Sequence, residues 1–267
     1  PTQRMQSCYY GSTPTPEQCS SALVSAGVRY TLPSSINRQI AEAVAAGKIV
    51  ARYTGGAEFG PRALGHRSIL ANPARADMKD VLNLRVKHRE QFRPFAPACL
   101  REHVGEFFDV DGDAPFMILI VRARDSAKTL IPAVVHNDGT ARVQTVSAEH
   151  NPDFHRTISE FHQITGIPVM INTSFNVNGE AIVETPTDAI ESFAFMDIDY
   201  LALGDYWIAK ADNPNLINVA SHDEYLAIRK NRYAREVPEA LASLDVRKYQ
   251  PWFYPDPHSV DVWVASI

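Results

Sequence analysis

The sequence has little that would tie it to a membrane, a disulfide framework or a structural zinc site. It contains three cysteines, Cys8, Cys19 and Cys99, an odd number without C-x-x-C spacing. No stretch of 18 apolar residues occurs, and the first residues, PTQRMQSCYYGSTPTPEQ, lack the apolar core of a signal peptide. We therefore expect a cytoplasmic protein that does not span a membrane.

The sequence also lacks the motifs of metal-binding sites and of catalytic nucleophiles. The nine histidines form no H-E-x-x-H or H-x-x-x-H pattern, so no protein-bound metal is expected in this chain. Neither a G-x-S-x-G turn nor a Cys–His arrangement indicates a protein nucleophile. The polar residues instead favour binding and polarising a phosphorylated substrate.

What the chain does contain is a globular composition with an uneven charge. Apolar residues make up 45% and charged residues 21%, as is typical of a folded domain. The net charge is −5, yet residues 48–101 hold eleven basic side chains against four acidic ones. This segment is either a solvated basic face or a local site for a small anion. The overall negative charge disfavours nucleic acid and membrane surfaces as partners.

Helical and strand patterns alternate irregularly, which predicts a mixed α/β sheet rather than a purely parallel one. Helices are expected near 17–26, from a cap at Ser34 or Ser35, from a cap at Asp77 to about 87, at 153–165, from a cap at Thr185 to about 196, and at 223–243. Strands are expected at 49–53, 68–72, 116–121, 132–136, 141–146, 167–171 and within 200–210, with a hairpin turn at Asn137-Asp138-Gly139. We expect an entry segment at 1–36, a core domain at 37–210 and an extension at 211–267.

Two segments place arginine or lysine in surroundings typical of loops, one rich in glycine and the other containing proline and phenylalanine. Residues 54–68 hold four glycines and Arg62; a P-loop is rejected because His66 and Arg67 stand where Lys and Ser or Thr are required. This loop either approaches a ligand closely or points its arginines into solvent. Further on, Arg93 lies among Phe92, Pro94 and Phe95, so its guanidinium should meet a carboxylate or a bound anion. Lys87 would add a point charge.

Two strand segments add polar groups. In ARVQTV, a single period-2 strand would place Arg142 and Gln144 on one face. Asn172 and Ser174 follow an apolar strand, where ligand groups often lie in α/β sheets. Taken alone, this second segment is also typical of a turn with side-chain capping.

Together, the segments EFGPRALGHRSILANP, NLRVKHREQFRPFAP, ARVQTV and NTSFNVNGEAIVETPTDAI resemble the carboxyl-terminal half of the O-carbamoyltransferases of antibiotic and nodulation-factor biosynthesis. The resemblance covers residues 37–210. It implies a YrdC-like fold, a twisted mixed sheet flanked by helices, here with amino- and carboxyl-terminal extensions. It also implies binding of carbamoyl phosphate and formation of carbamoyl-adenylate with ATP and nucleotide-bound Mg²⁺.

The resemblance assigns carbamoyl-phosphate contacts to Arg62, Lys87, Arg93, Arg142, Asn172 and Ser174. Among them, Lys87, Arg93 and Arg142 would be catalytic, because cations hold negative charge as bonds to phosphorus break. In the family, a Kae1-like half with a His-bound metal passes the carbamoyl group to an acceptor hydroxyl of a small-molecule natural product. That half is not found in this sequence, so a Kae1-like large subunit is the expected partner, and residues 211–267 are a candidate docking element.

Two alternatives stay open at this stage. One is a scaffold or regulatory subunit that retains an anion pocket without turnover. The other is a role linked to tRNA modification, where YrdC-like domains also occur. One departure from the family pattern is Ala181, where the family usually has Pro.

Overall fold

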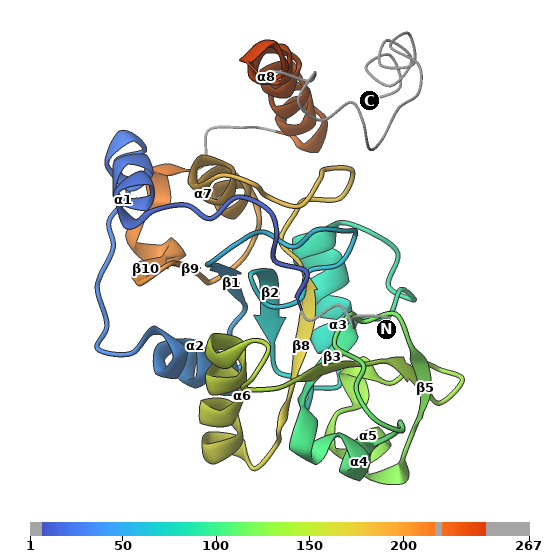
Figure 1. The fold of residues 1–267 in the computed structure, drawn as a ribbon. Coiled ribbons are helices and arrows are strands. Elements are labelled where there is room, and N and C mark those ends of the chain that lie inside the picture. Colours follow the sequence, from blue (N-terminus) through green and yellow to red (C-terminus); the bar gives the residue numbers. More distant parts are fainter. Residues whose placement is uncertain (1–6, 217–220, 244–267) are drawn as a thin grey trace, which may run out of the picture. The chain divides into compact units, whose positions relative to one another are not determined.

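The structure is a computed structural model that describes residues 7–216 and 221–243, with only the backbone described over 233–243. The chain divides into two compact units, Pro1–Asn218 and Val219–Ile267. In the first unit, helices and strands alternate along the chain (Figure 1). The described part of the second unit contains one helix, α8 (His222–Ser243).

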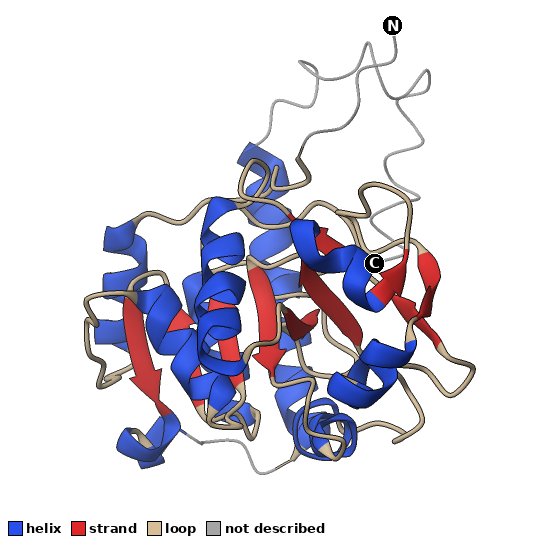
Figure 2. Ribbon diagram, turned by 90° about the horizontal axis from the view of Figure 1, so that it is seen from below, coloured by secondary structure: helices blue, strands red, loops and turns tan. Residues whose placement is uncertain are grey.

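Helices of the first unit cover both sides of its strands (Figure 2). The α-helices are α1 (Pro16–Ser25), α2 (Ile36–Ala45), α3 (Met78–Val81), α4 (Val104–Phe107), α5 (Asp125–Leu130), α6 (Pro152–Thr165) and α7 (Pro186–Phe195). Shorter turns are η1 (Leu82–Lys87), η2 (Arg101–His103), η3 (Pro132–Val134), η4 (Lys210–Asp212) and η5 (Pro214–Leu216).

The strands form two sheets. They are β1 (Val50–Tyr53), β2 (Arg67–Ala71), β3 (Ala96–Leu100), β4 (Phe108–Asp109), β5 (Ile120–Ala123), β6 (Thr140–Arg142), β7 (Gln144–Val146), β8 (Val169–Ser174), β9 (Tyr200–Leu203) and β10 (Tyr206–Ala209). The larger sheet has the order β10-β9-β1-β2-β8-β3-β7, and the smaller one β4-β5-β6. β1 with β9 and β3 with β7 are parallel, and the other pairs are antiparallel. The predicted mixed α/β fold is therefore confirmed.

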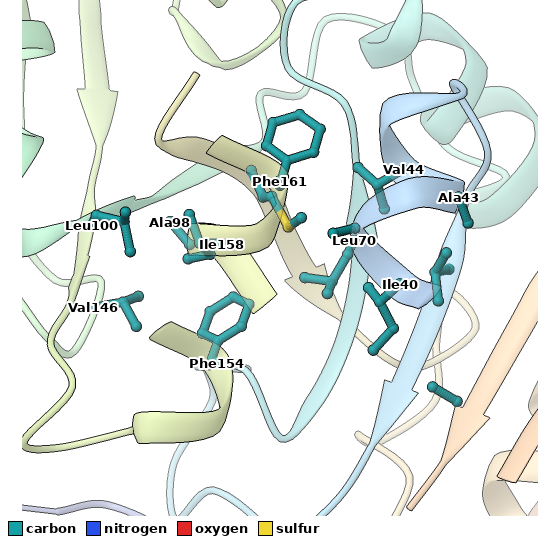
Figure 3. Close-up of a cluster of buried hydrophobic side chains, with 14 of the residues drawn as sticks. Ile40, Ala43, Val44, Leu70, Ala98, Leu100, Val146, Phe154, Ile158 and Phe161 are labelled. Carbon is teal, nitrogen blue, oxygen red and sulfur yellow. The ribbon is translucent and has the colours of Figure 1, made fainter. Parts of the chain in front are cut away.

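One core cluster lies between the sheet and the helix pair α2 and α6 (Figure 3). Ile40 and Val44 of α2 face Phe154, Ile158 and Phe161 of α6 across side chains from the strands. The other face of the sheet is covered near α7. On β1, Arg52 points to the ring of Phe154, and the next residue, Tyr53, points the opposite way and donates to the carbonyl of Glu184 just before α7.

Several predicted elements are confirmed. Ser35 caps α2, and Thr185 forms a capping box with Asp188 at the start of α7. The strands at 49–53 and 68–72, the two strands within 200–210, and the helices near 17–26, at 153–165 and at 223–243 are present with small shifts in their ends. The strand expected at 167–171 begins and ends later, at Val169 and Ser174.

Three local predictions are wrong, and one is confirmed only in part. The helical segment after Asp77 does run to Lys87, but Asp77 pairs with Arg75 instead of making a capping hydrogen bond, and the segment becomes π-helical at η1. Residues 132–134 form a 3-10 turn, so no hairpin forms around Asn137-Asp138-Gly139, although Gly139 has the left-handed φ of a turn. Only the end of the 116–121 run is strand. The segment 141–146 is split between β6 and β7, which belong to different sheets.

The amino-terminal segment also packs more than expected. Gly11 donates to the carbonyl of Ala57, and Ala57 donates to the carbonyl of Ser12, both at 3.0 Å. Cys8 is buried, and the ring of Tyr9 stacks on that of His66 at 3.8 Å. Residues 8–12 therefore form part of the wall around the glycine-rich loop, because their backbone groups pair with it.

Candidate anion-binding site

Strand register brings Asn172 and Ser174 of the predicted site residues next to the strands that flank the glycine-rich loop. Tyr53 at the carboxyl end of β1 pairs with Arg67 at the amino end of β2, and Ser68 pairs with Ser174 at the carboxyl end of β8. Asn172 of β8 pairs in turn with Ala96 at the start of β3. These strands lie next to one another in Figure 1. Segments more than 100 residues apart in sequence therefore meet at the Ser174 end of the sheet.

The glycine-rich loop between β1 and β2 carries Arg62. One carboxylate oxygen of Glu58, Oε1, accepts hydrogen bonds from the backbone N–H groups of Leu64, His66 and Arg67 at 2.7, 2.8 and 3.2 Å. This triple contact fixes the end of the loop. Arg62 itself is exposed, so its guanidinium is free to reach a ligand.

Arg67, in contrast, is structural. It is fully buried, its guanidinium lies 3.8 Å from the centre of the Tyr53 ring, and it donates to the carbonyls of Ser12 and Gly55 at 3.2 and 3.1 Å. Of the two arginines in the predicted loop, one faces solvent and one holds the loop together.

Lys87 ends the π-helical turn η1, and His88 follows with a left-handed φ of +46°. Lys87 Nζ donates to Ser174 O at 2.6 Å, Ser174 Oγ at 3.2 Å, Asn176 O at 3.0 Å and Asn176 Oδ1 at 2.9 Å. Only 4% of the residue is exposed. Burial, aided by the positive charge of Arg89, lowers the pKa of Lys87 to about 7. Lys87 therefore holds the end of β8 in place and is close to losing its charge.

Arg89 lies between the predicted cations. Its Nε donates to Asn83 Oδ1 at 2.8 Å, and its guanidinium is 4.9 Å from the centre of the Phe95 ring. Burial first, and then the positive charge of Arg93, lowers the pKa of Arg89. Arg89 in turn lowers the pKa of Lys87 and of Arg142. Sequence reasoning missed this residue, although its position within KHREQFR was a usable signal.

Arg93 is more exposed than its apolar neighbours suggested. Nearly half of its side chain is accessible, and its Nε lies 3.0 Å from a carboxylate oxygen of Glu90. Phe92 beside it is also exposed, so this segment turns outward instead of burying the arginine. Arg93 thus meets a carboxylate, one of the two partners expected, at the rim of the site.

Arg142 and Gln144 do not share one strand. The chain passes from the smaller sheet to the larger at Val143, which is fully buried. Arg142 ends β6 with a half-buried side chain whose Nε has no hydrogen-bond partner among the described residues. Burial, followed by the positive charges of Arg62 and Arg89, lowers the pKa of Arg142.

Asn172 and Ser174 lie two residues apart on β8. Asn172 is 1% exposed and donates to Ala63 O at 3.2 Å and to Gln144 Oε1 at 2.8 Å. Ser174 Oγ donates to Asn176 Oδ1 at 2.6 Å and accepts from Lys87. The structure thus joins Asn172 to the Arg62 loop and Ser174 to Lys87. Gln144 and Glu58 were not among the predicted site residues, although the strand pattern of ARVQTV had placed Gln144 on one face with Arg142.

The cations share one electrostatic property. Among the described residues, none of the following has a carboxylate at ion-pair distance: Arg62, Lys87, Arg89 and Arg142. After burial, the positive charge of Arg89 lowers the pKa of Lys87, and the charges of Arg62 and Arg89 lower that of Arg142. Because partly buried like charges without a counterion are costly, an anion would stabilise this arrangement.

A cavity of about 440 Å³ borders the site. Its lining includes Ser174 and Asn176 on one side and Gly60 and Pro61 of the Arg62 loop on the other. The cations do not line it, whereas the carboxylates do: Glu58, Glu180 and Glu184. Within the described ranges, no cluster of three or more histidine, cysteine or acidic side chains forms a metal site, and no helix is long and apolar enough to cross a membrane.

Several known proteins are similar to this chain in sequence. Nodulation protein NolNO of Sinorhizobium fredii (strain NBRC 101917 / NGR234) is 41% identical over 216 residues, or 79% of this chain and 32% of that protein. The 3'-hydroxymethylcephem-O-carbamoyltransferase of Streptomyces clavuligerus is 40% identical over 168 residues, or 63% of this chain and 32% of that protein. The chain spans about a third of the length of these curated relatives.

Among solved structures, full-length HypF in its phosphate- and nucleotide-bound form aligns with 66% of this chain and 22% of its own. The TM-score is 0.45 and the sequence identity 18%. The sequence model described as Carbamoyltransferase C-terminus matches residues 41–210. Because this match covers more than half of the chain and contains all the predicted site residues, the chain belongs to the carbamoyltransferase C-terminus family.

Proposed function

We propose that this chain binds carbamoyl phosphate and, with ATP and Mg²⁺, converts it to carbamoyl-adenylate. The main support is the group of cations without carboxylate partners at the Ser174 end of the sheet: Arg62, Lys87, Arg89 and Arg142. Arginine suits the oxygens of a phosphoryl group because its donors form a planar fork. Family membership favours a carbamoyl group as the remainder of the ligand.

In this proposal the residues have distinct roles. Arg62 from the exposed loop and Arg142 from β6 bind the phosphoryl oxygens, while Arg93 at the rim exchanges Glu90 for the ligand. Lys87 holds Ser174 and Asn176 in place and adds positive charge nearby. These charges stabilise the oxygens on which negative charge develops as bonds to phosphorus break.

The balance of the reaction defines its products. Carbamoyl phosphate, ATP and one water give carbamoyl-adenylate, inorganic phosphate and pyrophosphate.

The cavity of about 440 Å³ lies next to the cations and is of a size that admits a small ligand. Glu58 Oε2 in its lining has no hydrogen-bond partner among the described residues. Carboxylate oxygens suit Mg²⁺, which would neutralise nucleotide phosphates beside these glutamates.

We further propose that a Kae1-like large subunit takes the carbamoyl group and passes it to a hydroxyl of a small-molecule natural product. Support comes from the length of the relatives, of which this chain matches about a third. The acceptor would then be chosen outside this chain.

Release of pyrophosphate tests the proposed activation. In the presence of ATP and Mg²⁺, the chain should release pyrophosphate only when carbamoyl phosphate is added, and Arg93→Ala should abolish most of this release. If no ATP turnover occurs even with a Kae1-like partner present, the adenylate proposal is wrong and a non-catalytic anion-binding subunit is favoured.

A further inference from the structure

Asn172 Oδ1 is a buried acceptor that no described group satisfies. The atom is shielded from solvent and has no hydrogen-bond partner among the described residues. Buried polar atoms are normally paired, so an unpaired acceptor in a site calls for a donor from elsewhere. The two hydrogens on Asn172 Nδ2, in contrast, are both used.

A short buried chain of hydrogen bonds determines which way the Asn172 amide faces. Gln144, which is 2% exposed, donates from Nε2 to the carbonyl of Leu64 at 2.9 Å. Because a carbonyl oxygen only accepts, Nε2 must face Leu64, and Oε1 is left to accept from Asn172 Nδ2 at 2.8 Å. The carbonyl of Ala63 takes the second hydrogen of Nδ2. Both ends of the chain are backbone carbonyls, so its polarity is fixed and Oδ1 faces away from it.

The unpaired acceptor lies among the candidate ligand-binding groups. Ala63 and Leu64, which terminate the hydrogen-bond chain, directly follow Arg62. Ser174, which contacts Lys87, is two residues from Asn172 on the same strand. A ligand whose phosphoryl group is held by the cations would therefore have its other end near Asn172.

We propose that Gln144 is a positioning residue that presents Asn172 Oδ1 as an acceptor for the NH₂ of a carbamoyl group, and that this acceptor selects carbamoyl over acetyl compounds. The proposal rests on the proposed function, since it assumes that the cations hold the phosphoryl end. A carbamoyl NH₂ has two hydrogens to donate, whereas the methyl of an acetyl group would leave the buried oxygen unpaired. Sites of this kind discriminate strongly against analogues that lack the donor.

Two stable phosphonates make the test specific. Phosphonoacetamide and acetonylphosphonate carry the same phosphonate and carbonyl and differ only in an NH₂ or a CH₃ next to the carbonyl. Titration calorimetry with the intact chain should show that phosphonoacetamide binds at least about tenfold more tightly. In Gln144→Met, this preference should fall to about twofold or less, because the Asn172 amide can then turn. Affinity for inorganic phosphate should stay unchanged.

A control substitution and thermal unfolding show whether a change in the preference comes from a general loss of stability. Gln163→Met makes the same change on the exposed surface of α6 and should keep the full preference. Thermal melts monitor folding, and the ratio of the two affinities is compared only within each variant, so a general loss of stability does not mimic the result.

The outcomes separate this proposal from the one on which it depends. If the wild-type chain binds both phosphonates equally, or Gln144→Met keeps the preference, the role of Gln144 and Asn172 is overturned while the anion site stands. If neither phosphonate nor inorganic phosphate binds, both proposals are overturned.

Discussion

At the scale of residues, the surroundings of the Arg142 side chain favour a bound anion. Its Nε is buried without a hydrogen-bond partner among the described residues, and burial, followed by the charges of Arg62 and Arg89, lowers its pKa. A bound phosphoryl group would supply both the missing acceptor and the missing negative charge.

The first prediction concerns this side chain. Arg142→Met should weaken binding of carbamoyl phosphate by about ten- to a hundredfold, since a charge-assisted hydrogen bond contributes about 1.5–3 kcal/mol. Titration calorimetry measures the change. Arg122→Met is the matched control because Arg122 is an exposed arginine on the neighbouring strand β5; equal losses in the two variants would contradict a specific role for Arg142.

The second prediction follows from the lowered pKa of Lys87. At pH values between the folded pKa of about 7 and the ordinary lysine pKa of 10.5, the unfolded chain holds a proton that the folded chain has released. Stability therefore rises with pH across this window and levels off below about 7, where both the folded and the unfolded chain hold the proton. Urea unfolding at pH 6, 7, 8 and 9 should show this rise in the wild type but not in Lys87→Met.

The control for that series is Lys128→Met, which removes an exposed lysine paired with Asp125. It should keep the wild-type dependence on pH. A Lys87→Met series with the same slope as the wild type would show that Lys87 stays charged across the range.

At the scale of elements, the glycine-rich loop depends on Gly65. Its φ is +117°, and an added Cβ would lie 2.4 Å from the Phe154 ring of α6. Gly60 in the same loop also has a positive φ, +129°, but nothing lies within 4 Å of an added Cβ. The two positions thus share the backbone constraint and differ in packing.

The third prediction uses this difference. Gly65→Ala should lower the free energy of unfolding by about 1–3 kcal/mol more than Gly60→Ala, because only the former overpacks the core. Urea unfolding of both variants measures it. Equal losses would mean that the loop, and with it Arg62, is not anchored against α6.

Local chemistry predicted some elements better than others. The caps at Ser35 and Thr185 act within three residues, so the sequence near α2 and α7 was sufficient. The turn at Gly139 also forms, but β6 pairs with β5 from an earlier part of the chain, and no local pattern specifies that partner. The run at 116–121 was expected to be strand because it is apolar, yet Ile118, Leu119 and Ile120 are exposed.

In the candidate site, too, local sequence predicted some residues, whereas the roles of others depend on distant parts of the chain. Arg62, Lys87, Arg142 and their neighbours could be chosen from sequence because arginine and lysine stand out in apolar or glycine-rich surroundings. Glu58 and Gln144 could not, since their roles depend on backbone groups that only the folded loop brings to them. Arg93 stays a predicted site residue, and its exposure depends on how the segment turns, which its apolar neighbours did not indicate.

At the scale of the whole molecule, every candidate site residue lies in the unit Pro1–Asn218. Part of the candidate docking element at 211–267, including 244–267, lies outside the described residues. The proposed docking role of 211–267 therefore stays a prediction, separate from anion binding.

The fourth prediction follows from this division. A chain ending at Asn218 should bind carbamoyl phosphate within about twofold of the full chain, because a compact unit keeps its own core. Calorimetry measures the affinity, and circular dichroism confirms the fold. A folded chain that has lost binding would place part of the site in the second unit.

The most direct test of one shared anion site is a double-mutant cycle of carbamoyl-phosphate affinity with Arg62→Met, Arg142→Met and the double variant. The wild type should bind carbamoyl phosphate at a single saturable site. If both arginines contact the same phosphoryl group, as we propose, their losses should be non-additive by about 0.5–3 kcal/mol. Strictly additive losses, or no saturable binding by the wild type, would contradict the gathering of these cations around one ligand.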